Sequence, residues 1–250
     1  MIDRIELTNI IIMKGKVLLT MLFLAISLTG MSQAMWIMIF GDKLSNDRMQ
    51  SGITVSIGTA DMIGLPNASP MFNWAIGGFS EIRISKKNLF FAFDFAFKSP
   101  FGAKNLNSYF PDFIPDTSVI TTQDILMDNV SMALPLYLKY KTRVFGFGVG
   151  PQISYVYKSK LEYKAKTESG KNIKVTDNGK ELIHKFDVGA FAMAEIYLTP
   201  SHPKTSMRIS LRYYFGFLEP LKNYSGVHNS TLMATFGIPI GGKSEIKTTE

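Results

Sequence analysis

The stretch Phe91-Ala92-Phe93-Asp94-Phe95-Ala96-Phe97 alternates large apolar residues with small or charged ones at a strict period of two. Successive side chains of a β-strand point to opposite faces, so this period places the phenylalanines on one face and Asp94 on the other. A helix would not separate them in this way. The stretch therefore predicts a strand with one apolar face and one charged face.

Similar alternation recurs between about residues 51 and 240 and indicates further strands. The eight strand candidates lie near 51–60, 71–85, 88–98, 129–141, 144–158, 184–198, 205–217 and 229–240. In two of them an apolar row is expected to face outward: Phe186, Val188, Ala190, Ala192, Ala194, Ile196 and Leu198 in one, and Met207, Ile209, Leu211, Tyr213, Phe215 and Phe217 in the other. An exported chain can turn such a row toward lipid.

The predicted connections alternate in length along the chain. Short links at 86–87, 142–143 and 199–204 separate long links at 61–70, 99–128, 159–183 and 218–228. This alternation predicts long loops at one end of a barrel and both termini at the other. The strands are long enough to cross a hydrocarbon layer, which takes about 9 to 11 tilted residues. We therefore expect an all-β, antiparallel up-and-down transmembrane β-barrel of about eight strands in the outer membrane.

The polar faces predict a charge network inside the barrel. Its expected members are Glu81, Arg83, Asp94, Lys139, Asp187, Glu195, Arg208 and Arg212. An unpaired charge in a narrow lumen is costly, so these acids and bases should pair across strands, with Glu195 and Arg208 as one pair. Eight strands leave an interior that side chains can fill, so an open porin is not expected. The glycines of Phe145-Gly146-Phe147-Gly148-Val149-Gly150 fall on the inward parity, where they would relieve crowding or bend the strand.

Composition excludes several functional classes. A chain of 250 residues without cysteine has no disulfide, thiolate metal site or cysteine nucleophile. Its formal net charge of +7 comes from scattered Lys and Arg residues, without the aromatic signature of an RNA-binding domain, so we expect no nucleic-acid partner. The three histidines, His184, His202 and His228, lack metal-ligand spacing. We expect no metal and no cofactor.

The N-terminus is typical of an exported protein. Lys14 and Lys16 precede an apolar run at 17–28 and a small-residue exit that ends at Ala34. The run is shorter than a membrane span, which takes about 20 residues. Asp3 and Glu6 are unusual ahead of a signal peptide, and Met13 would be a more ordinary start. The expected organisation is a signal peptide at 1–34, an N-terminal linker at 35–50, the barrel at 51–240 and a polar tail at 241–250.

Several strand segments resemble those of the PorT-like outer-membrane β-barrel family of Gram-negative bacteria over roughly residues 50–240. The segments are Leu134-Pro135-Leu136-Tyr137-Leu138-Lys139-Tyr140, Phe147-Gly148-Val149-Gly150-Pro151-Gln152-Ile153-Ser154-Tyr155, Phe186-Asp187-Val188-Gly189-Ala190, Leu211-Arg212-Tyr213-Tyr214-Phe215-Gly216 and His228-Asn229-Ser230-Thr231-Leu232. The resemblance implies an integral outer-membrane protein of the cell envelope, with some relatives linked to protein secretion. One departure is the ending Gly237-Ile238-Pro239-Ile240 before a polar tail, where outer-membrane barrels commonly end on an aromatic residue.

Three functions compete at this point. The first is a non-enzymatic structural or interaction protein that binds outer-membrane lipid, lipopolysaccharide, or envelope and secretion-system proteins. Its apolar link 99–128 would contact a partner or close the barrel mouth, and its lysine-rich segment 158–180 would meet lipopolysaccharide headgroups or form a solvated hairpin.

The second function is a lipid-modifying hydrolase that uses His228 and Ser230, which share a strand face but have no acidic partner evident in the sequence. The third is a secreted soluble barrel for a small apolar ligand, in which the outward rows would have to line a cavity.

Overall fold

The computed structural model describes residues 49–240 except 86–87, 111–119, 169 and 202–204. The expected signal peptide, the linker up to residue 48 and the tail at 241–250 lie outside the described residues. The elements are β1 (Met49–Ile63), β2 (Met71–Arg83), β3 (Leu89–Ala103), β4 (Ile120–Lys141), β5 (Phe145–Thr167), β6 (Asn172–Asn178), a short 3-10 helix η2 (Gly179–Glu181), β7 (Phe186–Tyr197), β8 (Arg208–Gly216) and β9 (His228–Ile240).

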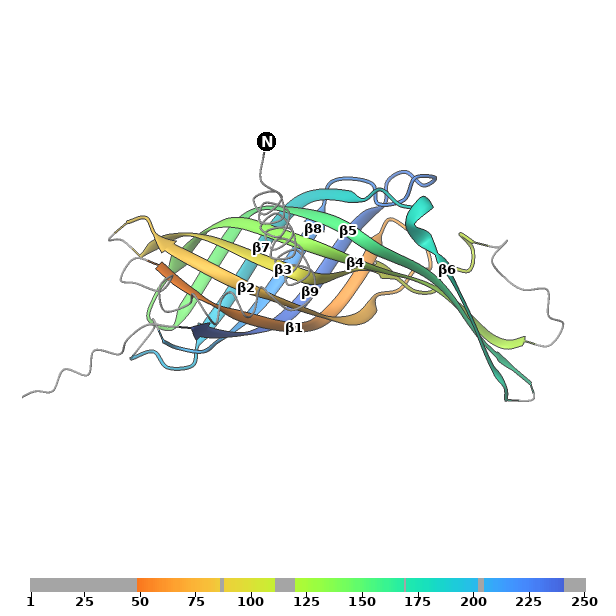
Figure 1. The fold of residues 1–250 in the computed structure, drawn as a ribbon, viewed down its shortest axis with the longest axis horizontal. Coiled ribbons are helices and arrows are strands. Elements are labelled where there is room, and N and C mark those ends of the chain that lie inside the picture. The colour runs from red at the N-terminus through yellow and green to blue at the C-terminus, as the bar shows by residue number, and fades with distance from the viewer. Residues whose placement is uncertain (1–48, 86–87, 111–119, 169, 202–204, 241–250) are drawn as a thin grey trace, which may run out of the picture.

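Eight of these strands close into a ring (Figure 1). β1 pairs with both β2 and β9, and the β4–β5 pairing completes the circle. Each pairing of neighbours is antiparallel. Closure leaves the ring without an edge strand, so its backbone groups are paired within the sheet. The predicted eight-stranded antiparallel barrel is confirmed.

The two ends of the barrel differ in their connections. Residues 84–88, 142–144 and 198–207 connect strands at the end where Ser51 of β1 pairs with Ile240 of β9. Residues 64–70, 104–119 and 217–227 connect strands at the other end, where β6 and η2 also lie. Outer-membrane barrels have short periplasmic turns and longer extracellular loops. The long-loop end is therefore the extracellular end.

The prediction of long loops at 99–128 and 159–183 was wrong over much of their length, because strands occupy large parts of both segments. β4 already begins at Ile120 and β5 continues to Thr167, so 120–128 and 159–167 pair with each other, and β6 pairs with the far part of β5. Together these three segments form a sheet, the extracellular extension, that bends away from the barrel (Figure 1). The ladder shifts register between Val130 and Ser131, with Tyr157 as the extra residue of β5. This bulge changes the parity of β5, and the changed parity hid the strand in the sequence.

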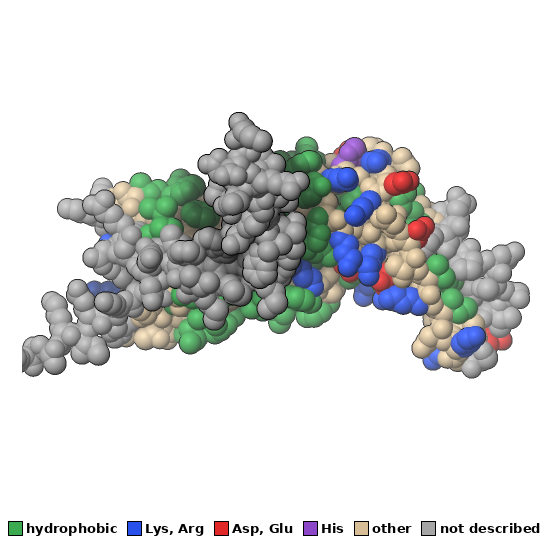
Figure 2. Space-filling model, in the orientation of Figure 1, with side chains coloured by type: hydrophobic (Ala, Val, Ile, Leu, Met, Phe, Trp, Pro, Cys, Tyr) green, Lys and Arg blue, Asp and Glu red, His purple; other side chains and the backbone are tan. Residues whose placement is uncertain are grey.

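Exposed large apolar side chains occur on all eight strands of the ring, and Figure 2 shows some of them in green on one face of the barrel. The rows predicted to face outward in β7 and β8 do so; Leu211, for example, is 56% exposed. Residues between them, such as Glu195 and Arg208, are buried. In a bilayer the backbone must be satisfied internally, which a closed ring achieves. An apolar outside around a charged inside therefore places the barrel in lipid, as an outer-membrane protein.

Within the described part of the chain, helices long and apolar enough to cross a membrane are absent.

Candidate functional site

A buried charge cluster fills the lumen toward the short-turn end. Lys139 lies at its centre, with Nζ 2.5 Å from Glu81 Oε1 and in an ion pair with Glu195, and these three side chains are 0–1% exposed. Arg208 pairs with Glu81 and lies 3.9 Å from Glu195 Oε2. Lys141 Nζ lies 3.5 Å from the second oxygen of Glu81. We call these five residues the lumen charge cluster.

Glycines and aromatic rings shape the space around this cluster. A Cβ at Gly146 would lie 2.6 Å from Glu195 Oε1, and one at Gly237 would lie 2.7 Å from Arg208 Cγ. The Arg208 guanidinium carbon lies 4.1 Å from the centroid of the Phe79 ring. Small residues on the inward parity therefore leave the room that large charged side chains occupy. The expectation that Gly146 relieves crowding is confirmed.

The other expected interior charges form two separate groups. Arg212 Nη1 lies 2.5 Å from Asp94 Oδ2, and the Tyr137 hydroxyl donates a hydrogen bond of 2.9 Å to Asp94 Oδ1. Asp187 is buried farther along, where Asn229 donates a hydrogen bond of 2.8 Å to it. The acids thus have cationic or amide partners, as buried carboxylates require.

One member of the expected network is misplaced. Arg83 is exposed, with its guanidinium carbon 5.3 Å from the centroid of the Phe90 ring. It shares the parity of Glu81, but it is the last residue of β2, and at the barrel mouth that parity leads into solvent. Lys141, and not Arg83, is the additional base of the buried cluster. The sequence analysis missed Lys141, although this residue is two positions from Lys139 on the same strand face.

Glu195 and Arg208, which were expected to pair, are diagonal neighbours on β7 and β8 and do not lie directly opposite each other. Glu195 lies opposite Ser210, and Arg208 lies opposite Tyr197.

An apolar cluster fills the opposite, extracellular end of the barrel. It draws on several strands and on the loops above them: Met62, Leu65, Phe101, Ala103, Leu106, Ile125, Met127, Val156, Leu161, Tyr163, Ala165, Ile183, Tyr214, Leu221 and Val227. Leu106 and Phe101 are fully buried, and Tyr109 and Phe110 are partly buried and pack against the cluster. The described part of the link 99–128 therefore closes the barrel mouth. Pro111, Phe113, Ile114 and Pro115 lie outside the described residues. We call this cluster the loop plug.

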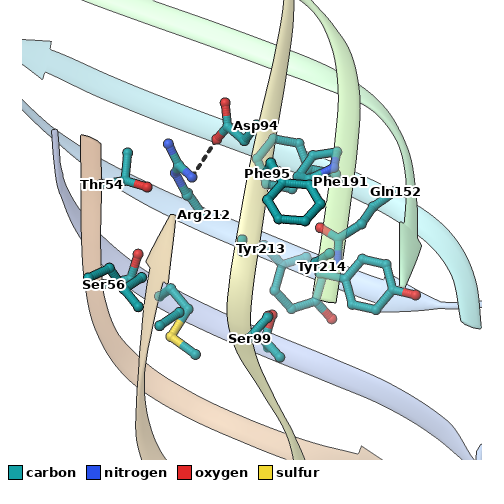
Figure 3. Close-up of a pocket in the computed structure, with 17 residues that line it drawn as sticks. Thr54, Ser56, Asp94, Phe95, Ser99, Gln152, Phe191, Arg212, Tyr213 and Tyr214 are labelled. Atoms are coloured by element: carbon teal, nitrogen blue, oxygen red, sulfur yellow. Dashed lines mark ion pairs between the residues drawn. The ribbon is translucent and has the colours of Figure 1, made fainter. Parts of the chain in front are cut away.

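A small cavity lies inside the barrel, lined by polar and apolar side chains (Figure 3). Its volume is about 50 Å³, and Asp94 and Arg212 line it together with Thr54, Ser56 and Gln152. Two members of the outward apolar rows, Phe95 and Tyr213, also border the cavity. This small cavity, with an ion pair in its lining, is not the apolar pocket that the soluble-barrel hypothesis requires. Figure 3 shows the Asp94–Arg212 ion pair against the cavity.

The extracellular extension has one apolar and one charged face. Tyr163 lies between Ile125 and Val175 in the register, whereas Lys164 lies between Asp124 and Lys174. The first face joins the loop plug, and the second faces out.

Glu162 lies on the charged face of the extension, with Oε2 3.1 Å from Lys174 Nζ and 3.5 Å from Lys164 Nζ. Burial raises the pKa of Glu162, but the hydrogen bonds and positive charges of Lys174 and Lys164 outweigh it and hold that pKa below its ordinary value. The described part of the predicted lysine-rich segment 158–180 lies mainly in β5 and β6 of the sheet and ends in η2.

Comparisons with known proteins give structural likenesses to membrane barrels. The chain is similar to Ail, the attachment invasion locus protein of Yersinia pestis, solved in complex with the heparin analogue sucrose octasulfate, with 9% identity, a TM-score of 0.39, and coverage of 77% of this chain and 99% of that one. It is also similar to Neisserial surface protein A, with 11% identity, a TM-score of 0.35, and coverage of 76% and 96%. The CymD monoaromatic hydrocarbon channel gives 9% identity, a TM-score of 0.28, and coverage of 86% and 93%. A scan against family models and a search of curated proteins both give no match.

The residues proposed for hydrolysis lie at the extracellular start of β9. Ser230 lies opposite Asp61 of β1 and opposite Phe215 of β8, and His228 lies opposite Ile63. The His228 ring centroid is 5.3 Å from that of Phe215, and His228 Nδ1 is buried without a hydrogen-bond partner. The β1–β9 pairing thus supplies an acid beside this serine, which the sequence did not reveal.

Across the described residues, His, Asp and Glu side chains do not gather in groups of three that could hold a metal ion.

Proposed function

We propose that this protein is a non-porin component of the outer membrane with a structural or interaction role, and that it presents its extracellular extension to other envelope components. The observation that carries the proposal is a lumen filled at both ends. The lumen charge cluster occupies one end and the loop plug the other, and the cavity shown in Figure 3 has a volume of only about 50 Å³. A barrel of this kind anchors a surface; it does not pass solutes.

The partners that we propose are lipopolysaccharide and other proteins of the envelope. The resemblance of strand segments such as Leu134–Tyr140 to the PorT-like family supports membership in that family and a link to protein secretion. The extension supports an interaction role, because β6 adds an exposed strand with Lys174 and Val175 beyond the barrel. Binding residues are often carried by such projections on a rigid scaffold.

Planar-bilayer recording tests the non-porin role. The purified, heat-modifiable barrel should insert without opening steady conductance steps. Stable ion-conducting steps from the intact chain would contradict the proposal.

Photocrosslinking in intact cells tests the interaction role. The sequence has no cysteine, so a single cysteine can carry the probe at Val175 on β6 or, as a control, at Leu211 on the lipid face. Protein adducts should form at Val175 and be absent at Leu211. Equal adducts, or none at Val175, would count against the extension as the contact surface.

A second candidate function is hydrolysis of an outer-leaflet lipid ester, favoured by Asp61 lying opposite Ser230. In this reaction the Ser230 hydroxyl oxygen would attack the ester carbonyl while His228 accepts its proton and returns it to the departing alcohol. Water would then hydrolyse the acyl-serine, releasing a fatty acid and restoring Ser230. Asp61 would orient or stabilise the histidine.

Fatty-acid release from vesicles of lipopolysaccharide and phospholipid tests the hydrolase. Release should occur with the wild-type barrel and stop in Ser230→Ala and His228→Ala, with Asp61→Asn strongly impaired. Thr235→Ala is a matched control, because Thr235 lies on the inward face of the same strand. No release by the wild type, or release unchanged by Ser230→Ala, would refute this candidate.

A further inference from the structure

A set of lysines faces outward where the lipid-facing surface of the barrel meets the extension. Phe72 and Trp74 of β2 mark this level, since they are 70% and 47% exposed near the extracellular end of the strand. Aromatic side chains of this kind form the girdle of a membrane barrel at the headgroup level. Lys98 Nζ lies 3.3 Å from the centroid of the Trp74 ring. This contact ties one lysine to the girdle.

Two more lysines reach the same level from β5. Lys158 lies opposite Val130, and Lys160 lies opposite Asp128. Lys98 is within electrostatic reach of both Lys158 and Asp128, so the three strands β3, β4 and β5 bring these charges together. Asn73 donates a hydrogen bond of 3.2 Å to Asp128. We call Lys98, Lys158 and Lys160 the rim lysines.

The bulge in β5 is the local cause of this arrangement. Tyr157 is the extra residue there, and its hydroxyl donates a hydrogen bond of 3.1 Å to the Phe97 carbonyl oxygen. Tyr157 and Lys158 are consecutive, yet both are exposed, whereas Val156 and Ser159 on either side are buried. A bulge re-aims side chains in this way. Without it, Lys158 would enter the barrel.

The charges of the rim do not cancel. Asp128 lies opposite Lys160 and within electrostatic reach of Lys98, and the three rim lysines outnumber it. Figure 2 shows Lys and Arg side chains gathered immediately beyond the apolar surface of the barrel. Anionic headgroups at a membrane surface attract such lysines, by about 1 kcal/mol each. The occupant that fits is a lipid with clustered phosphates at the headgroup level of the outer leaflet.

We propose that the rim lysines form a binding site for the phosphate groups of lipopolysaccharide. The site rests on the proposed outer-membrane function and specifies its lipid partner. Lys98 is held by the Trp74 ring, and Lys158 and Lys160 approach from the bulged strand. Asp128 opposes an anion here and keeps affinity moderate. The fatty chains of the lipid would lie along the apolar rows below.

Titration of the detergent-refolded full chain tests the site. The probes are purified lipopolysaccharide, the same lipid after phosphatase treatment, and phosphatidylglycerol. The variant Lys98→Gln/Lys158→Gln/Lys160→Gln should bind intact lipopolysaccharide roughly 100-fold more weakly at low salt, taking about fivefold for each lysine. Asp128→Asn should bind several-fold more tightly than wild type.

Matched variants separate the site from net charge. Lys171→Gln/Lys180→Gln/Lys222→Gln removes the same charge from exposed positions of the extracellular end and should leave affinity within about twofold. Replacing the rim lysines with arginine should restore binding, because charge is kept. Phosphatase-treated lipopolysaccharide should bind the wild type and the triple glutamine variant of the rim lysines with similar affinity. Equal losses in both lysine-to-glutamine sets, or no loss in either, would overturn the site.

Two further readouts keep the outcomes distinct. A heat-modifiable band and recovery in the outer-membrane fraction show that a variant is folded and located as proposed. If the wild type is absent from that fraction, the proposed function fails. If it is present but prefers phosphatidylglycerol over lipopolysaccharide, the site as proposed here is wrong while the function stands.

Discussion

Replacing Glu81 with glutamine should destabilise the barrel more than any surface substitution of a charge. Glu81 contacts Lys139 at 2.5 Å, Lys141 at 3.5 Å and the guanidinium of Arg208. The lumen charge cluster holds two acids and three bases, so the substitution leaves three cations with Glu195 alone. These cations cannot rehydrate easily, because their side chains are at most 8% exposed.

The magnitude follows from burial and distance. Two unit charges 4 Å apart interact by about 4 kcal/mol at an effective dielectric constant of 20. Breaking a buried ion pair by removing one partner typically costs about 3–5 kcal/mol. We therefore expect Glu81→Gln to lower the free energy of unfolding by about 3–5 kcal/mol. Glu81→Gln with Lys139→Met returns the cluster to its original net charge and should cost less than Glu81→Gln alone.

Urea unfolding of the barrel in detergent micelles, followed by tryptophan fluorescence and by the heat-modifiable gel band, measures the loss. Glu219→Gln is a control, because Glu219 is exposed and accepts a hydrogen bond from the Gly226 backbone. Its cost should stay below about 1 kcal/mol. A cost for Glu81→Gln as small as that of the control would refute a dry, paired charge cluster and indicate a hydrated lumen.

Three other predictions concern crowding, lipid exposure and pH. Gly146→Leu would press into the Glu195 carboxylate, 2.6 Å from a Cβ at that position, and should cost about 1–3 kcal/mol in the same unfolding assay. Leu211→Arg places a charge on the lipid face and should cost about 2–4 kcal/mol if that position lies near the midplane; Leu211→Ala serves as the control. The folded-state pKa of Glu162 is depressed, so its stabilisation is present above the unfolded pKa and is lost as pH falls through the folded pKa. The protection factors of the β6 amides, which correct for the pH dependence of the intrinsic exchange rate, should therefore fall on acidification in the wild type and change little in Glu162→Gln.

The strands with unbroken alternation could be predicted from the sequence. β7 and β8 keep a strict period of two, so their outward rows were identified correctly. β5 could not be followed past Tyr157, because the bulge places two consecutive residues on the same side. β6 is short and polar, and its strand conformation depends on pairing with β5. Local pattern does not encode such a dependence.

A charged residue could be assigned to the interior when it had the inward parity of its strand and also lay well inside the barrel, away from the strand end. Lys139 and Glu195 satisfied both, but Arg83 satisfied parity alone, since depth depends on where the barrel ends. Contacts between strands that are far apart in the chain could not be predicted from the sequence. Asp61 meets Ser230 only because the first and last strands close the ring, and register across that closure has no local signal.

Spin-label accessibility along β8 tests the lipid-embedded barrel most directly. The native chain has no cysteine, so single cysteines at successive positions from Arg208 to Gly216 can each carry a nitroxide in phospholipid vesicles. Collision with dissolved oxygen should peak at Ile209, Leu211, Tyr213 and Phe215 and fall at the positions between them. A period of two with the opposite phase, or uniform exposure to a water-soluble quencher, would contradict an apolar outer face in lipid around a charged interior.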